Sequence, residues 1–104
     1  MTPDDTASEP TNRAEVDRAI TKIRQRMDTL DAQLVALLNE RASCARDIGL
    51  LKDKVGLEVY QPDREIEVLN HVRGHNQGPL DGGAVTRVFE RIIDESRRLE
   101  RTKG

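Results

Sequence analysis

The feature that most constrains this chain is an apolar seam whose residues alternate at steps of four and three without a slip. The seam comprises Val16, Ile20, Ile23, Met27, Leu30, Leu34 and Leu37, and it resumes after Arg41 at Cys44, Ile48 and Leu51. This spacing is typical of one long helix with a coiled-coil-like face. No proline interrupts it, and Gly49 is the only glycine before Gly56. The sequence therefore predicts an all-α chain with one long N-terminal helix.

The rest of the chain carries signals for two shorter helices. Gly56 suits a helix C-terminus and Pro62 a first helical position, so a short connector is expected between them. The second helix is predicted over 62–73, followed by a loop over 74–79, and Asp81 is a good N-cap for the third helix. The apolar residues assigned to these helices are Ile66, Leu69 and Val72, expected to be buried, and Val85, Val88, Phe89, Ile92, Ile93 and Leu99.

Composition and charge narrow the class further. With 35% charged and only 2% aromatic residues, the chain favours helices over a sandwich or barrel, and a net charge of −2 disfavours nucleic acid as a partner. A single cysteine cannot form an internal disulfide, and no apolar run is long enough to cross a membrane. Residues 1–12 are polar and contain two prolines, which predicts a disordered tail before a helical domain over 13–104. We expect a cytoplasmic protein.

The length of the first helix predicts a partner. About 40 residues at 1.5 Å each make a rod of roughly 60 Å, whereas a compact chain of this size has a radius of gyration of about 13 Å. One chain cannot cover such a seam, so the most economical partner is a second copy. The sequence therefore predicts a homodimer built around paired long helices.

Three polar residues stand where the pattern calls for apolar ones, and a fourth lies on the same helix face as the first of them. Arg41 interrupts the seam, and Lys52 returns to within about 20° of the same helix face three turns later. Arg41 either sets the register by pairing with a carboxylate or, together with Lys52, grips a small dianion. In the third helix the apolar stripe continues into Ser96 and Glu100. A carboxyl at that position is either frayed at the chain end or held in a site.

Three further charged residues admit two interpretations each. Glu65, with Arg64 beside it, lies near the expected buried side of the second helix, where an exposed, salt-bridged first turn is the alternative to a site. Arg24 lies about 25 Å before Arg41 on a straight helix. Arg24 is therefore either a solvated charge beside the seam or, if it serves the same ligand, a residue supplied by the other protomer.

Three stretches then match a known family. They are IRQRMDTLDAQLVALLNERASCARDIGLLK (Ile23 to Lys52), VYQPDREIEVL (Val59 to Leu69) and VTRVFERIIDESRRLE (Val85 to Glu100). The match runs through about four-fifths of the chain, leaving out the tail and the extreme C-terminus, and these stretches resemble the all-helical AroQ class of chorismate mutases. The resemblance implies an intertwined dimer of three-helix chains. It also implies a Claisen rearrangement of chorismate to prephenate, on the branch of the shikimate pathway toward phenylalanine and tyrosine.

The resemblance also implies roles for particular residues. Arg24 of the second chain and Arg41 would bind the two substrate carboxylates, and Lys52 would donate to the ether oxygen. Arg64 would form part of the polar wall of the site, and Glu65 would accept a hydrogen bond from the ring hydroxyl. Ser96 would contact the substrate near the ring carboxylate, and Glu100 would lie on the other side of the ether oxygen. A unimolecular pericyclic reaction of this kind requires no nucleophile, metal or cofactor.

Two residues depart from the family pattern. Many members have Gln where this chain has Glu100, and a carboxylate facing a developing oxyanion would repel it, so Glu100 must be protonated to help. Gln61 stands where relatives often have Asp, which leaves the hydroxyl pocket less defined.

Other functions stay open at this point. An isochorismate-pyruvate lyase looks similar in fold, and a non-catalytic helical dimerisation module would need the seam alone. His71 and His75 lie four residues apart, but two ligands are too few for a metal site, so a surface role is favoured. The resemblance also leaves open a regulatory complex with the synthase that begins the shikimate pathway.

Overall fold

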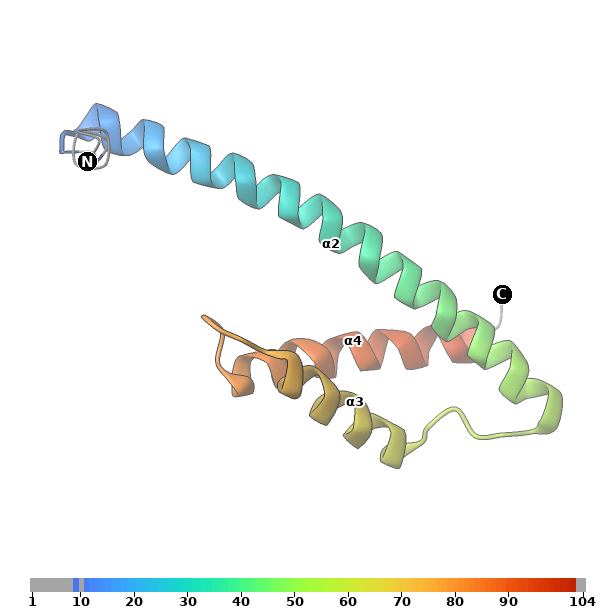
Figure 1. Cartoon of the computed structure of the whole chain (residues 1–104). Helices are drawn as coiled ribbons and strands as arrows, with labels where there is room; N and C mark the ends of the chain where they lie inside the picture. Colours follow the sequence, from blue (N-terminus) through green and yellow to red (C-terminus); the bar gives the residue numbers. More distant parts are fainter. Residues whose placement is uncertain (1–8, 10, 103–104) are drawn as a thin grey trace. The chain divides into compact units, whose positions relative to one another are not determined.

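A computed structural model describes residue 9 and residues 11–102, and this part of the chain is helical with no strand. Helix α2 spans Arg13–Val55, α3 spans Pro62–His75 and α4 spans Gly82–Thr102 (Figure 1). The chain divides into two compact units, residues 1–38 and 39–104, so that α2 contributes to both. The tail predicted over residues 1–12 lies outside the described residues except for Glu9, Thr11 and Asn12.

In the first unit, α2 begins immediately after a capping residue. The side-chain oxygen of Asn12 accepts from the Glu15 backbone N–H at 2.9 Å, and the Asn12 amide donates back to the Glu15 carboxylate. The first of these bonds satisfies one of the orphan backbone donors of the first turn. The helix therefore begins at Arg13, one turn before the first residue of the apolar seam.

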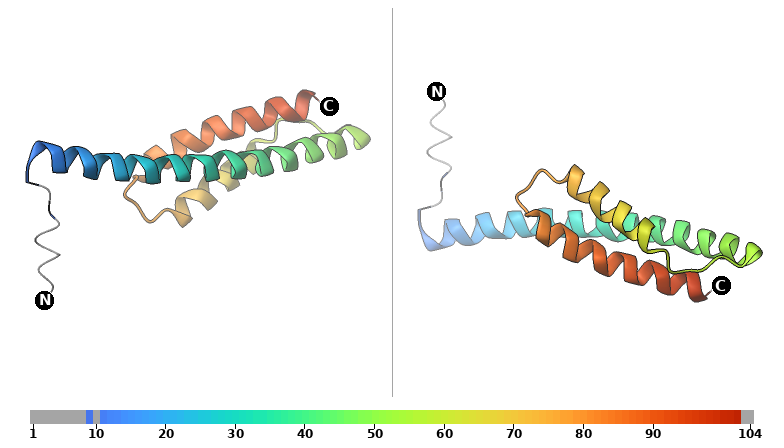
Figure 2. Two further views of the ribbon diagram at one scale, coloured as in Figure 1. Left: turned by 90° about the horizontal axis from the view of Figure 1, so that it is seen from above. Right: turned by 90° about the horizontal axis from the view of Figure 1, so that it is seen from below.

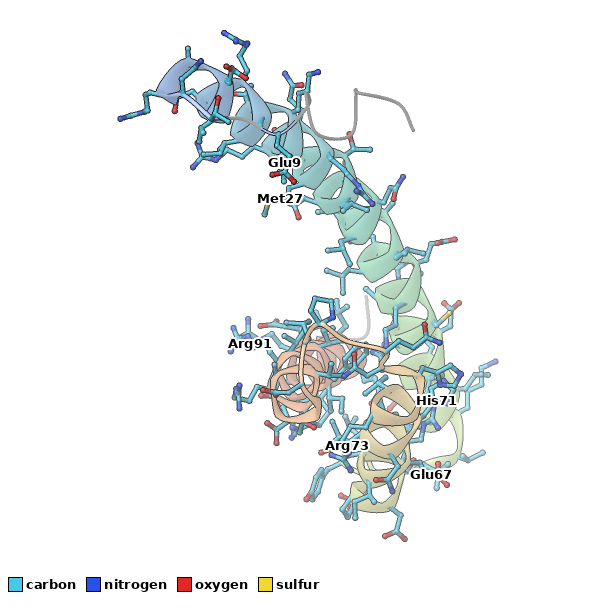
Figure 3. The ribbon with its side chains drawn as sticks, turned by 60° about the vertical axis from the view of Figure 1, so that its left-hand side comes forward. Glu9, Met27, Glu67, His71, Arg73 and Arg91 are labelled. Carbon is cyan, nitrogen blue, oxygen red and sulfur yellow. The ribbon has the colours of Figure 1, made fainter. Side chains whose placement is uncertain are left out.

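The apolar seam is open to solvent in this unit of a single chain. Its residues from Ile20 to Leu37 each expose between 38% and 61% of their surface. Figure 3 shows Met27 standing out from the helix. Such a continuous apolar face is typical of a helix that packs against another helix. Within the described residues, no helix is long and apolar enough to cross a membrane.

The C-terminus of α2 is fixed by glycine. Gly56 adopts φ 69°, a left-handed conformation that side chains disfavour. The Leu57 N–H donates to the Lys52 carbonyl at 2.9 Å and the Gly56 N–H to the Asp53 carbonyl at 3.4 Å, which is the Schellman pattern. The predicted C-cap at Gly56 is confirmed, and this cap turns the chain into the connector that leads to Pro62.

In the second unit, α3 and α4 lie side by side (Figures 1 and 2). Each helix supplies one residue to the buried apolar core, namely Ala45 of α2, Val68 of α3 and Ile93 of α4. At the start of α4 the Asp81 carboxylate accepts from the Ala84 N–H at 2.7 Å, which confirms the predicted N-cap.

Two expectations for α3 were wrong. The helix continues through Gly74 to His75 instead of ending at Arg73, because one glycine weakens a helix without breaking it. Ile66, expected to be buried, is 57% exposed, whereas Leu69 and Val72 are half-buried. The packed face instead centres on Val68, which the sequence pattern had not assigned to it.

Candidate active site

The second unit contains a cavity of about 360 Å³. The last turns of α2, the connector, α3 and α4 all line it, and Ala45, Val68 and Ile93 form its apolar part. Its charged lining comprises Arg41, Lys52, Arg64 and Arg97 against the carboxylates of Glu65 and Glu100. Positive charge is therefore in excess, as a site for an anionic ligand requires.

Lys52 and Glu100 form an ion pair inside this cavity. The Lys52 Nζ lies 3.2 Å from Glu100 Oε2, and the two side chains are only 13% and 10% exposed. The same ammonium donates to the Val59 carbonyl at 3.1 Å, so the connector also holds it. Helix α4 continues to Thr102, and Glu100 is buried. The alternative of a frayed carboxyl at the chain end is therefore wrong.

This pair meets because α2 and α4 approach unusually closely. A Cβ atom added to Gly49 would lie 2.7 Å from the Cα of Glu100 and 2.8 Å from its carbonyl oxygen, closer than real contacts allow. Gly49 is one helical turn before Lys52, so the absence of a side chain at Gly49 brings α4 close to the α2 face that carries Lys52. Gly49, the only glycine inside the predicted first helix, is therefore explained by the close packing of α2 against α4.

Arg41 and Ser96 form a second polar contact between the same helices. The Arg41 Nη1 donates to Ser96 Oγ at 2.7 Å, and the Ser96 hydroxyl donates to the Ile92 carbonyl at 2.9 Å. Burial, and then the nearby charge of Arg64, lower the pKa of Arg41. Its partner is a hydroxyl and not the carboxylate expected of a register-setting residue. Among residues 11–102, this half-buried guanidinium pairs with a hydroxyl and with no carboxylate, so it retains most of its capacity for an anion.

Glu65 contacts Arg97, a residue to which the sequence pattern and the family resemblance assign no role. Arg97 Nε lies 3.0 Å from Glu65 Oε2, and the Arg97 guanidinium carbon lies 5.4 Å from the centre of the Tyr60 ring. Both charged side chains line the cavity. Arg97 comes four residues after the buried Ile93, so a signal was present: it is another charge in apolar register.

The other predicted site residues are less constrained. Arg64 lines the cavity, but its side chain is 68% exposed and forms an ion pair with Glu67 at 3.3 Å. This agrees with the alternative interpretation of an exposed, salt-bridged first turn. Gln61 also lines the cavity and precedes α3 without a side-chain capping bond. Arg24 lies exposed in the other unit, whereas every lining residue of the cavity comes from residues 39–104.

The cysteine and the two histidines occupy exposed positions. Cys44, expected to be a small seam residue, is exposed and lines the cavity. The rings of His71 and His75 lie 4.4 Å apart, and His75 Nδ1 is 2.9 Å from the His71 carbonyl oxygen. Within the described part of the chain, no three His, Cys, Asp or Glu side chains gather as a metal ion would need.

Comparison with known proteins identifies the class to which this fold and cavity belong. The model of the family "Chorismate mutase type II" matches residues 23–101. That range includes all three described helices for most of their length and every residue lining the cavity. The chain therefore belongs to the type II chorismate mutase family.

Particular relatives agree with this assignment. The bifunctional chorismate mutase/prephenate dehydratase of Neisseria gonorrhoeae is 40% identical over 86 residues, which cover 83% of this chain and 23% of that protein. The chorismate mutase of Methanocaldococcus jannaschii is 26% identical, with coverages of 79% and 84%. This chain thus spans about a quarter of its bifunctional relatives but most of a single-function one.

Solved structures show the same fold. A chorismate mutase from Thermus thermophilus superimposes with a TM-score of 0.78 at 31% identity, covering 80% of this chain and 94% of that one. A Helicobacter pylori chorismate mutase, in complex with prephenate, gives a TM-score of 0.76 at 27% identity, with coverages of 83% and 93%.

Proposed function

We propose that this chain is a chorismate mutase that converts chorismate to prephenate. The observation that carries the proposal is the buried Lys52–Glu100 pair beside Arg41 in a cavity with excess positive charge. Family membership and the similarity to a mutase in complex with prephenate support it. A cavity of about 360 Å³ lies at the lower end of the range for small-molecule sites, which suits a compact dianion.

The reaction determines what the side chains must do. One C–O bond breaks and one C–C bond forms within a single molecule, so no proton or electron enters or leaves. The first requirement is to hold a flexible substrate in a compact conformation, and the fork of Arg41 suits a substrate carboxylate. The second is a donor at the ether oxygen, where negative charge develops, and the Lys52 ammonium fills that role.

Glu100 gives the proposed mechanism a proton requirement. In the structure, its carboxylate pairs with Lys52. Once the ether oxygen lies beside both side chains, a charged carboxylate would repel the developing oxyanion, whereas a protonated one would donate to it. We therefore assign Glu100 a proton in the substrate complex. We also propose that Glu65 accepts a hydrogen bond from the ring hydroxyl of the substrate and that Ser96 contacts the substrate near the ring carboxylate.

The functional unit that we propose is a homodimer with Arg24 supplied in trans. The support is the apolar seam, which is 38% to 61% exposed from Ile20 to Leu37 in one chain. Pairing two such helices would cover it. The helical domain would span residues 13–104. A cytoplasmic location fits a chain whose single cysteine forms no internal disulfide, and a complex with a shikimate-pathway synthase stays a prediction.

The direct test is to follow chorismate and isochorismate separately with the purified chain. We expect chorismate to be consumed and prephenate to appear in equal amount, with isochorismate consumed at a far lower rate. Release of pyruvate from isochorismate at the higher rate would favour the lyase. Lack of reaction with either substrate, and no binding of a bicyclic transition-state analogue, would favour the non-catalytic dimerisation module.

A further inference from the structure

Arg97 of α4 is the one charged residue among those lining the cavity to which neither the family resemblance nor the proposed mechanism gives a role. Its Nε lies 3.0 Å from Glu65 Oε2 on α3, and the two side chains are only 27% and 26% exposed. Half-buried pairs of this kind are screened less by water and salt than surface pairs. Arg97 is therefore the main positive charge that the structure places directly on the Glu65 carboxylate.

The guanidinium of Arg97 is itself fixed by two other groups. Its Nη2 donates to the Asp94 carboxylate one turn earlier on α4. Its central carbon lies 5.4 Å from the centre of the Tyr60 ring, within the range for a cation–π contact. Arg97 thus links α3, α4 and the connector at the edge of the cavity, and this link constrains where Glu65 can lie.

The contact leaves Glu65 able to accept a hydrogen bond. Glu65 Oε2 and Arg97 Nε are close enough for an ion pair, yet among the described residues neither atom makes a hydrogen bond of good geometry. The two side chains therefore attract each other as opposite charges, and the carboxylate oxygen can still accept a hydrogen bond. A hydroxyl that enters the cavity can use that capacity after a small rotation of the side chain.

We propose that Arg97 is a positioning residue that holds Glu65 for the ring hydroxyl of the substrate. This proposal rests on the proposed mutase function, because it needs a ligand with such a hydroxyl. The hydroxyl is present in both the substrate and the transition state, so its contact with Glu65 strengthens binding without changing the chemical step. Loss of Arg97 should therefore raise KM more than it lowers kcat.

The test is a double-mutant cycle between Arg97→Gln and Glu65→Gln, with chorismate as substrate. In the wild-type background, Arg97→Gln should raise KM about tenfold and change kcat by less than about threefold. In the Glu65→Gln background, the same change should alter KM by less than about twofold, since the carboxylate that Arg97 holds is gone. Arg97→Lys keeps the charge but not the fork, and we expect an intermediate KM.

Arg91→Gln is the matched control on the same helix. Arg91 is also paired, with Glu95, but its side chain is 73% exposed and points away from α3 (Figure 3). Its KM should stay within about twofold of wild type, as expected for a surface ion pair. Circular dichroism spectra should show equal helicity for all variants, and Arg97→Lys keeps the test valid if the Gln variant unfolds.

Two results would overturn the proposal while leaving the mutase function in place. An equal rise in KM from Arg97→Gln in both backgrounds would show that Arg97 acts on the substrate directly. An unchanged KM in the wild-type background would show that Glu65 needs no such support. A wild-type chain that does not convert chorismate would instead overturn the proposed function, and this inference with it.

Discussion

At the scale of single residues, the candidate site is a set of charges placed in apolar register. Arg41 and Glu100 each stand where the helix pattern calls for an aliphatic side chain, and Lys52 lies on the same helix face as Arg41. All three line the cavity. Burying such groups is unfavourable unless they are paired or face a ligand. That is why a sequence pattern could locate them. It could not locate the Arg97–Glu65 contact, which depends on how α3 and α4 pack.

The first prediction concerns Lys52→Ala. If the ammonium stabilises the developing oxyanion, its removal should lower kcat by about 10² to 10³, as for other preorganised donors. The measurement is the rate of chorismate loss at saturating substrate. Because the change also leaves Glu100 buried without its partner, the control is the double variant Lys52→Ala/Glu100→Gln, which carries no unpaired charge and should be equally slow.

The second prediction concerns pH and Glu100. If turnover needs a protonated Glu100, kcat/KM for chorismate should fall as pH rises from 5 to 8, since the proton becomes harder to acquire. Glu100→Gln presents a permanent donor of similar shape, so it should keep activity and flatten the profile. A wild-type rate that is constant from pH 5 to 8 would contradict this role of Glu100.

At the scale of helices and caps, local chemistry accounts for where the elements end. The cap at Gly56 and the N-cap at Asp81 were predicted, because each depends on a residue with a special local conformation or bond. The buried face of α3 was not. Ile66 is apolar and was expected in the core, but 57% of its surface is exposed. Which face is buried depends on neighbours that a sequence pattern does not contain.

The third prediction concerns the close contact between α2 and α4. Gly49→Ala introduces a Cβ 2.7 Å from the Glu100 Cα, so the helices must separate. We expect it to lower the free energy of unfolding by about 1–3 kcal/mol, as overpacking does. It should also lower kcat, because Glu100 and Lys52 would move apart. Urea unfolding monitored by circular dichroism, together with the chorismate assay, measures both effects.

Gly74→Ala is the control for that variant. Gly74 is also inside a helix, but a Cβ there meets nothing within 4 Å. The change should raise the free energy of unfolding by about 0.4–1 kcal/mol and leave kcat unaltered. If Gly49→Ala proved as stable and as active as Gly74→Ala, the close helix contact would have no part in forming the site.

At the scale of the whole molecule, the exposed seam and the position of Arg24 both favour a dimer of two copies of this chain. From Ile20 to Leu37, α2 leaves a continuous apolar face uncovered in one chain. The residues that line the cavity all come from residues 39–104 of that chain. Arg24 is not among them, so under the proposal it must come from a second chain. A dimer that pairs two seams would bury the apolar face and would allow Arg24 of one chain to reach the cavity of the other. The dimer is a prediction that the sequence alone can make, because it follows from helix length and periodicity.

Mixing two inactive variants tests the shared site most directly. In the proposed dimer, a chain with Arg24→Ala and a chain with Lys52→Ala together form one intact site, since each supplies what the other lacks. Random pairing after joint refolding should restore about one quarter of wild-type prephenate formation from two nearly inactive parents. A mixture no more active than either parent, under conditions where the chains exchange, would contradict a site built by two copies of this chain.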